Sequence, residues 1–355
     1  MEKLQKLREQ MKREGIDGLL VSYGQNRRYL TNFTGTYGYV LISADKAMLL
    51  TDFRYSEQAL KQAPHYEVVK LPTKDALFTQ VASLAEQIGI KRLGFEEDHL
   101  TCGLFRKVES EWKREMIPVS GLVEKLRMIK TPDELDKLRT AAQIADAAFT
   151  HIIGWMRPGV KEWEVSNELE AFMRNQGASS SAFDTIVASG VRSALPHGVA
   201  SEKQLEQGDM ITLDFGAVYQ GYRSDITRTV ALGDPHPKLR EIYGIVLEAL
   251  KKGIDGIKPG ITGREADALS RDYIDAHGYG ENFGTGLGHG VGLDIHEEPF
   301  LSKSCVKVIE QGMVITVEPG IYVPGLGGVR IEDDILVTAN GNELLTHSPR
   351  ELIVL

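Results

Sequence analysis

Hydrophobic and polar positions alternate with two different periods along the first third of the chain. Apolar residues at helical spacing predict three helices, and short apolar runs predict three strands. The helices are expected at residues 1–14, 54–63 and 75–88, and the strands at 18–22, 39–43 and 47–51. This alternation indicates an α/β domain, which we place at residues 1–124.

A helix start signal follows the first domain. Thr131 fits the N-cap position, Pro132 the first helical position, and Glu134 comes two residues later. We expect a long amphipathic helix from here to about residue 156, ended by the ProGly pair at 158–159.

Two further helices and several strand-like segments complete the second domain. The helices are expected at 162–175 and 239–252, and the apolar segments between them read as strands. The predicted fold class is therefore α+β, with the first α/β domain followed by a second domain at residues 125–355.

Five polar residues interrupt apolar, strand-like segments of the second domain. They are Asp214, Asp225, His289, Glu318 and Glu332. In IleThrLeuAspPheGly (211–216), alternation predicts a half-buried strand whose inward side carries a carboxylate. A buried carboxylate needs a partner, and the recurrence of this pattern indicates a metal site.

A tight hairpin would relate the two aspartates. A two-residue turn at Tyr219 and Gln220 pairs Asp214 directly with Asp225 on one sheet face. Two carboxylates that close repel each other unless one is protonated or a cation lies between them. A longer turn centred on Gly221 is the alternative and would change the register.

The alternation of side chains along a strand places Glu318 and Glu332 each on the polar face of its segment. In MetValIleThrValGluProGly (313–320), Glu318 lies on the face opposite the neighbouring apolar residues. In GlyValArgIleGluAspAsp (328–334), Arg330 and Glu332 share one face. Each segment thus offers one carboxylate to the same kind of site.

His289 stands in a segment where glycine recurs at every second position, residues 284–292. The bare strand face permits close backbone approach. No register of this segment fits a G-x-G-x-x-G phosphate loop, which excludes that type of nucleotide site. A single Asp or Glu is usually a salt bridge or cap, and a single His a core residue, but five together favour a metal site.

These segments closely resemble the proline-specific metallopeptidases, the prolidase and aminopeptidase P group, whose pita-bread fold is shared with methionine aminopeptidase. The motifs are HisGlyVal (197–199), AspPheGlyAlaValTyrGlnGlyTyrArgSerAspIleThrArgThr (214–229), GlyHisGlyValGlyLeuAspIleHisGluGluPro (288–299), ValGluProGlyIleTyr (317–322) and ValArgIleGluAspAsp (329–334). The resemblance is strong over residues 125–355. It implies a prolidase-like N-terminal domain and a pita-bread catalytic domain.

The resemblance also implies two divalent ions, with one Asp and the last Glu bridging them. The implied ligands are Asp214, Asp225, His289, Glu318 and Glu332. Four carboxylates balance the charge of two such ions, and oxygen ligands with one imidazole suit manganese, with cobalt or zinc as alternatives. Two-metal sites of this kind activate water for peptide hydrolysis.

Three more residues receive roles, the two histidines from the resemblance and Arg330 from the strand face that it shares with Glu332. His197 and His296 are expected to bind substrate and stabilise the intermediate, and Arg330 to contact substrate or support a ligand. Aminopeptidase P sequences commonly carry His where this chain has Thr285. We therefore expect an Xaa-Pro dipeptidase, with an Xaa-Pro aminopeptidase as the alternative. A methionine aminopeptidase-like enzyme or a non-catalytic pita-bread binding module is less favoured.

Length and composition agree with a soluble enzyme, and the resemblance implies that its substrates are short proline-containing peptides. The 355 residues include 41 Lys and Arg against 50 Asp and Glu, a net charge of −9, which argues against nucleic-acid or anionic-membrane partners. Cys102 and Cys305 lie far apart and fit a reducing cytoplasm. No signal peptide or membrane span is expected. The resemblance implies a homodimer, and residues 26–35 offer aromatics and cations for such a contact, with a solvated loop as the alternative.

Overall fold

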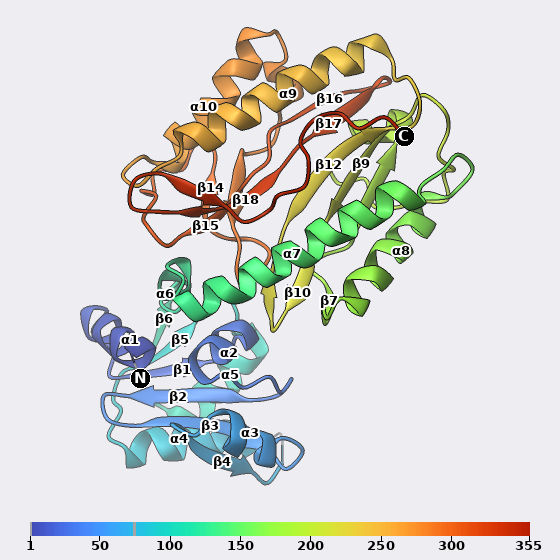
Figure 1. The fold of residues 1–355 in the computed structure, drawn as a ribbon. Helices are drawn as coiled ribbons and strands as arrows, with labels where there is room; N and C mark the ends of the chain where they lie inside the picture. The colour runs from blue at the N-terminus through green and yellow to red at the C-terminus, as the bar shows by residue number, and fades with distance from the viewer. Residues whose placement is uncertain (1, 74–75) are drawn as a thin grey trace. The chain divides into compact units, whose positions relative to one another are not determined.

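The computed structural model describes residues 2–73 and 76–355. The chain divides into two compact units, Met1–Arg127 and Met128–Leu355. Both units combine helices and strands, which confirms the predicted α+β class (Figure 1). No helix within the described residues is long and apolar enough to span a membrane.

The first unit is built on one six-stranded sheet with strand order β4-β3-β2-β1-β5-β6. Its strands are β1 Gly18–Val21, β2 Tyr39–Ser43, β3 Ala47–Asp52, β4 Glu67–Leu71, β5 Leu93–Glu96 and β6 Met116–Val119. Its helices are α1 Glu2–Arg13, α2 Gly24–Thr31, α3 Ser56–Gln62, α4 Ala76–Gln87 and α5 Cys102–Trp112, and α6 Glu124–Met128 lies at the division. The three predicted helices and three predicted strands are present, and the predicted helix positions Met1 and Asp75 lie outside the described residues.

Most of the segment 26–35 is buried and is not a solvated loop, and its part in a contact between two chains stays a prediction. Much of it lies in α2, and its largest side chains are buried within the first unit. Arg27 is 7% exposed and donates to the carbonyl oxygens of Gly38 and Gly35, both at 2.6 Å. These carbonyls satisfy the guanidinium inside the unit, a contact that hydrophobic patterning does not reveal.

Two helix pairs pack on the strands of the second unit (Figure 1). They are α7 Pro132–Trp155 with α8 Glu162–Asn175, and α9 Pro237–Gly256 with α10 Gly263–Ala276. The start of α7 is the predicted one, because Glu134 accepts a hydrogen bond from the backbone N–H of Thr131 at 2.8 Å. Helix α10 had no counterpart among the predicted helices.

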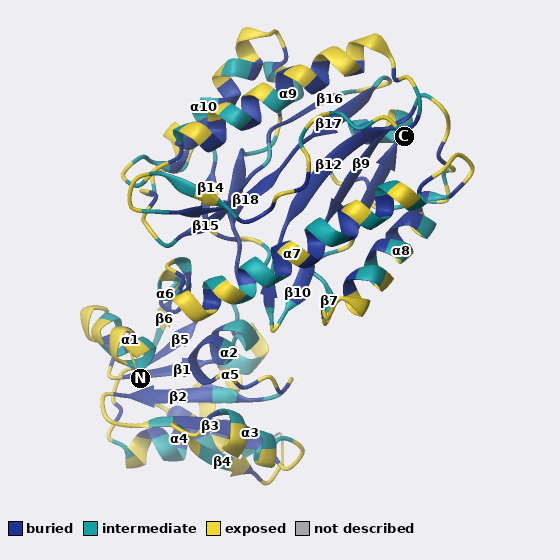
Figure 2. Ribbon diagram, viewed as in Figure 1, coloured by how far each residue is buried: buried dark blue, intermediate teal, exposed yellow. Residues whose placement is uncertain are grey.

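The strands of the second unit form short sheets that fold over two apolar cores. They are β7 Ser180–Ser181, β8 Ile186–Ser189, β9 Met210–Phe215, β10 Ala217–Tyr219, β11 Tyr222–Arg223, β12 Ile226–Ala231, β13 Gly288–Gly290, β14 Glu297–Leu301, β15 Val314–Val317, β16 Gly320–Val323, β17 Gly327–Arg330, β18 Asp333–Val337 and β19 Asn342–Leu344. One core joins α7 and α8 to β8, β9 and β12, and the other joins α9 and α10 to β15 through β18. Buried strands therefore lie between exposed helix faces (Figure 2).

The hairpin register differs by two residues from the prediction. Asp214 pairs with Thr227 and not with Asp225, so the direct pairing of the two aspartates was wrong. The turn lies at Gln220 and Gly221, both with positive φ, which fits a two-residue turn with glycine second. A shift of two preserves which face each residue occupies, so the two aspartates can still reach one site.

The glycine-rich strand lies against its neighbours as closely as predicted. A Cβ on Gly288 would come within 2.2 Å of the carbonyl oxygen of Thr316, and one on Gly290 within 2.5 Å of that of Glu298. Only glycine permits this approach, which brings His289 between the neighbouring strands.

Candidate metal centre

Residues from five separate segments of the second unit surround one cavity of about 640 Å³. Each stands in or next to a buried strand, which fixes its backbone. Asp214 lies in β9, Asp225 precedes β12, His289 lies in β13, Glu318 follows β15 and Glu332 lies between β17 and β18. The structure thus brings all five predicted ligands to the same cavity.

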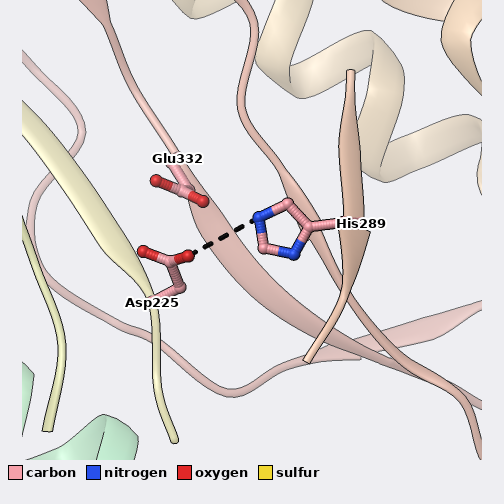
Figure 3. A group of neighbouring side chains, drawn as sticks. All are labelled: Asp225, His289 and Glu332. Atoms are coloured by element: carbon pink, nitrogen blue, oxygen red, sulfur yellow. Dashed lines mark ion pairs between the residues drawn. The ribbon is translucent and has the colours of Figure 1, made fainter. Parts of the chain in front are cut away.

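Asp225, His289 and Glu332 form the tightest group. Each contributes one potential ligand atom, and these atoms lie within 4.8 Å of one another. Figure 3 shows the two carboxylates and the imidazole directed towards one another. Nε2 of His289 is 3.7 Å from Oδ2 of Asp225 and 3.3 Å from Oε1 of Glu318. Segments of the chain that are distant in sequence therefore converge on one point that is rich in ligand atoms.

The hydrogen bonds of His289 fix which ring nitrogen faces the carboxylates. Its Nδ1 lies 3.1 Å from the carbonyl oxygen of Gly290, which can only accept, so Nδ1 carries the proton. Burial lowers the pKa of His289, which favours the neutral ring. The lone pair of Nε2 is therefore directed at the acidic group, as a metal ligand requires.

Burial raises the pKa of three carboxyl groups in the cavity. Burial, followed by repulsion from the neighbouring carboxylates, raises the pKa of Asp225 and of Glu332 well above the usual range. Burial likewise raises the pKa of Glu318 to about 7, against the opposing effect of Arg330. Asp225 and Glu332 therefore favour their protonated forms at neutral pH unless a cation compensates their charge.

The donor atoms fit divalent ions. Oδ1 of Asp214, Oδ1 of Asp225 and Oε1 of Glu332 are buried and have no hydrogen-bond partner. Buried carboxylate oxygens without partners are rare in folded proteins and call for an unseen ion or water. Hard oxygen donors with one imidazole match manganese, cobalt or zinc better than a soft metal.

Arg330 connects the acidic group to the rest of the cavity wall. Its Nη2 donates to Oδ2 of Asp214 at 2.6 Å, and its Nε to Oγ1 of Thr227 at 3.1 Å. Its Nη1 donates to the hydroxyl of Tyr322 at 2.6 Å and to the carbonyl oxygen of Pro196 at 3.1 Å. All three guanidinium nitrogens are thus engaged within the protein, and Arg330 orients Asp214.

Three residues that orient the acidic side chains were not among the site residues predicted from the sequence. The hydroxyl of Thr227 donates to Glu332 at 2.6 Å, and Asp334 accepts from the backbone N–H of Asp225 at 2.9 Å. Tyr322 is the third, through Arg330. Parity put Thr227 on the ligand face, which was a usable signal. Asp334 contacts a segment 109 residues earlier, whereas Tyr322 contacts Arg330 from the neighbouring strand of one hairpin.

Both histidines that received catalytic roles line the cavity. His197 is exposed in the turn after Pro196, and His296 lies in the loop before β14. The rings of His296 and His289 meet edge to face with centroids 4.4 Å apart. Partial burial and the nearby imidazoles lower the pKa of His296, which keeps this ring neutral near pH 7.

The remaining cavity wall is largely apolar. Phe183, Ile186, Val199 and Phe300 line it, together with Thr285. Val199 and Phe300 stay 51% and 45% exposed, so they form an apolar rim around an acidic floor. This arrangement suits a small ligand that carries both an apolar and a polar group.

Comparisons with known proteins match each of the two units to a known family of domains. Residues 136–339 match the family described as metallopeptidase family M24, and residues 3–129 match the creatinase/prolidase N-terminal domain. An Xaa-Pro dipeptidase of Pyrococcus horikoshii is 43% identical over 99% of each chain.

Two solved structures share the whole fold. The structure of an Xaa-Pro dipeptidase from Bacillus anthracis matches with a TM-score of 0.98 and 60% identity, over 100% of this chain and 99% of that one. An X-Pro aminopeptidase from Thermotoga maritima matches with a TM-score of 0.91 and 39% identity, over 98% of this chain and 100% of that one.

Proposed function

The chain belongs to metallopeptidase family M24, and on that premise we propose that it hydrolyses the Xaa-Pro bond of short peptides, with Xaa-Pro dipeptides as the preferred substrates. The observation that carries the proposal is the cavity floor, where four acidic side chains and one neutral imidazole leave three buried oxygens without partners. The Xaa-Pro dipeptidases of Pyrococcus horikoshii and Bacillus anthracis support the substrate class.

We propose that Asp214, Asp225, His289, Glu318 and Glu332 hold two divalent ions. Bound ions supply Lewis-acid chemistry, which polarises a carbonyl group and makes water a stronger acid. Manganese is the proposed ion, with cobalt and zinc as alternatives, because the donors are oxygens and a single imidazole.

The protein's own side chains then bind and orient the peptide. His296 and His197 line the cavity, and a neutral imidazole can donate one hydrogen bond to the oxygen that gains charge during cleavage. Arg330 holds Asp214 in place through its bond at 2.6 Å. The apolar rim excludes water from one side of the substrate and packs against the proline ring.

The proposal extends to domain organisation and cellular setting. We propose an N-terminal α/β domain at residues 1–124, a pita-bread catalytic domain at 125–355, and a homodimer; the two family matches at 3–129 and 136–339 support the division. A cytoplasmic location is supported by the low cysteine content of the chain.

An Xaa-Pro aminopeptidase is the second candidate, favoured by the likeness to the Thermotoga maritima enzyme. Hydrolysis of Ala-Pro and of Ala-Pro-Ala by the manganese-loaded protein separates the two. A dipeptidase gives the higher kcat/KM on Ala-Pro. A higher kcat/KM on the tripeptide would favour the aminopeptidase, and no cleavage of either peptide would refute both.

A further inference from the structure

Glu162 is a fully buried carboxylate at an unusual place, the first residue of α8. Acidic residues in the first turn of a helix commonly interact with the helix terminus. Glu162 is 0% exposed and accepts five hydrogen bonds. Oε1 accepts from the backbone N–H and the hydroxyl of Ser189, both at 2.8 Å. Oε2 accepts from the backbone N–H of Ser201 at 3.0 Å, its hydroxyl at 2.6 Å, and Nη1 of Arg192.

All five donors belong to one segment, residues 189–201. Ser189 ends β8, and Ser201 lies twelve residues later, so the carboxylate of Glu162 joins the two ends of the segment. It acts there beside the backbone hydrogen bond from the N–H of Trp163 to the carbonyl oxygen of Ser201 at 3.2 Å and the bridge between Ile186 and Val199. Between Ser189 and Ser201 the chain forms the short 3-10 helix Gly190–Ala194 and the turn that carries His197. The position of this histidine therefore depends on how the two ends of the segment are held.

The segment forms one wall of the cavity. His197 and Val199 line it, and the hydroxyl of Ser193 accepts from the backbone N–H of Gly328 at 2.8 Å. Its middle is held from the other side, where Arg330 donates to the carbonyl oxygen of Pro196. The segment is thus held at its two ends by Glu162 and near His197 by Arg330.

A simple helix cap would have different contacts. Glu164, two residues along α8, accepts from the backbone N–H of Lys161 at 2.8 Å and so satisfies its own helix terminus. The side chain of Glu162 makes its hydrogen bonds to the segment instead. Burying a carboxylate is costly unless it is well bonded, so these contacts have a function beyond capping.

We propose that Glu162 is a positioning residue, which joins the two ends of residues 189–201 and thereby sets where His197 stands in the cavity. Its effect on turnover rests on the proposed role of His197 in peptide hydrolysis. Its effect on the position of residues 189–201 is independent of that role, because it follows from the hydrogen bonds of Glu162 alone.

The test is Glu162→Gln in the full-length, metal-loaded protein. The amide keeps the size of the side chain but offers one oxygen, and its NH₂ group would face N–H and O–H donors. We expect hydrogen exchange of the backbone amides at 190–200 to rise by about tenfold or more, because hydrogen bonds to a charged group are stronger than neutral ones. With Ala-Pro as substrate, kcat should fall by on the order of 10²-fold, as small misplacements of reacting groups do. Metal content should not change.

Two matched variants separate positioning from general damage. Glu164→Gln removes a carboxylate from the same helix turn and should leave exchange at 190–200 and kcat unchanged. In the His197→Ala background, Glu162→Gln should cause almost no further fall in kcat, since residues that act through one another are not additive. Ser201→Ala, which removes one hydroxyl at the end of the segment, should give a smaller change in the same direction and replaces Glu162→Gln if that variant does not fold.

The outcomes are distinct. Unchanged exchange at 190–200 in both Glu162→Gln and Ser201→Ala would overturn the proposal. Equal losses of kcat with and without His197 would overturn it too, because Glu162 would then act elsewhere. Faster exchange in a protein whose wild-type form cleaves no Xaa-Pro peptide would sustain the positioning of the segment and refute the proposed function instead.

Discussion

Asp225→Asn should have opposite effects on stability in the absence and presence of metal. In the metal-free protein, burial and neighbouring carboxylates raise the pKa of Asp225, so the folded state favours its protonated form. The unfolded chain ionises it at about 3.9. Stability then falls as pH rises above that value, because the folded state binds more protons than the unfolded state.

The size of the effect follows from linkage. Keeping one carboxyl protonated costs about 1.4 kcal/mol for each pH unit above its ordinary pKa, which gives an upper limit of about 4 kcal/mol at pH 7. Asparagine avoids this cost, and one kcal/mol shifts Tm by about 2–4 °C in a unit of this size. We expect metal-free Asp225→Asn to melt several degrees above the metal-free wild type at pH 7, with a smaller difference at pH 5.

Metal reverses the order. Each of the two proposed ions, at 100 times its Kd, stabilises the wild type by about 2.7 kcal/mol, and the two together exceed the upper limit of about 4 kcal/mol, whereas the variant loses an anionic ligand and gains little. Calorimetric Tm values with chelator and with manganese, together with elemental analysis, test this. A variant that retains the wild-type metal content and turnover, or one that is destabilised without metal, would refute the assignment of Asp225.

Two further predictions concern the same site, and a third tests the proposed homodimer. His296→Ala should lower kcat by on the order of 10²–10³ with metal content intact, because a hydrogen bond to developing charge is lost; loss of metal would instead make His296 a ligand. Manganese affinity should rise as pH increases from 6 to 8, since burial raises the pKa of Glu318 to about 7 and its proton must leave before binding. Calorimetry in buffers of different ionisation enthalpy should show more protons released at pH 6 than at pH 8. Light scattering should give the mass of two chains; a monomer would contradict the proposed homodimer.

Strand periodicity and motif chemistry were enough to find the acidic floor. Side chains alternate across a strand with a period of two, so the face of Glu318 or Glu332 could be predicted without the fold. A register error of two at Asp214 and Asp225 did no harm, because the face is preserved. The error itself came from the turn, where the positive φ of Gln220 is set by local geometry that propensity does not specify.

Contacts between segments distant in sequence could not be predicted. Burial of Arg27 depends on two carbonyl groups whose direction is set by the completed first unit. Arg330 was expected near a ligand, yet its bond to Pro196 links β17 to a loop 134 residues earlier. Glu162 had no signal at all, because an acid at a helix start reads as an ordinary capping residue.

The most direct test of the central claim is the rate of Ala-Pro hydrolysis measured against the number of manganese ions bound per chain, starting from chelated protein. If the five residues hold two ions that carry the chemistry, hydrolysis should be absent at zero, and rise to its maximum as the second ion binds. Full activity in the chelated protein, or saturation with metal and no cleavage, would contradict the account.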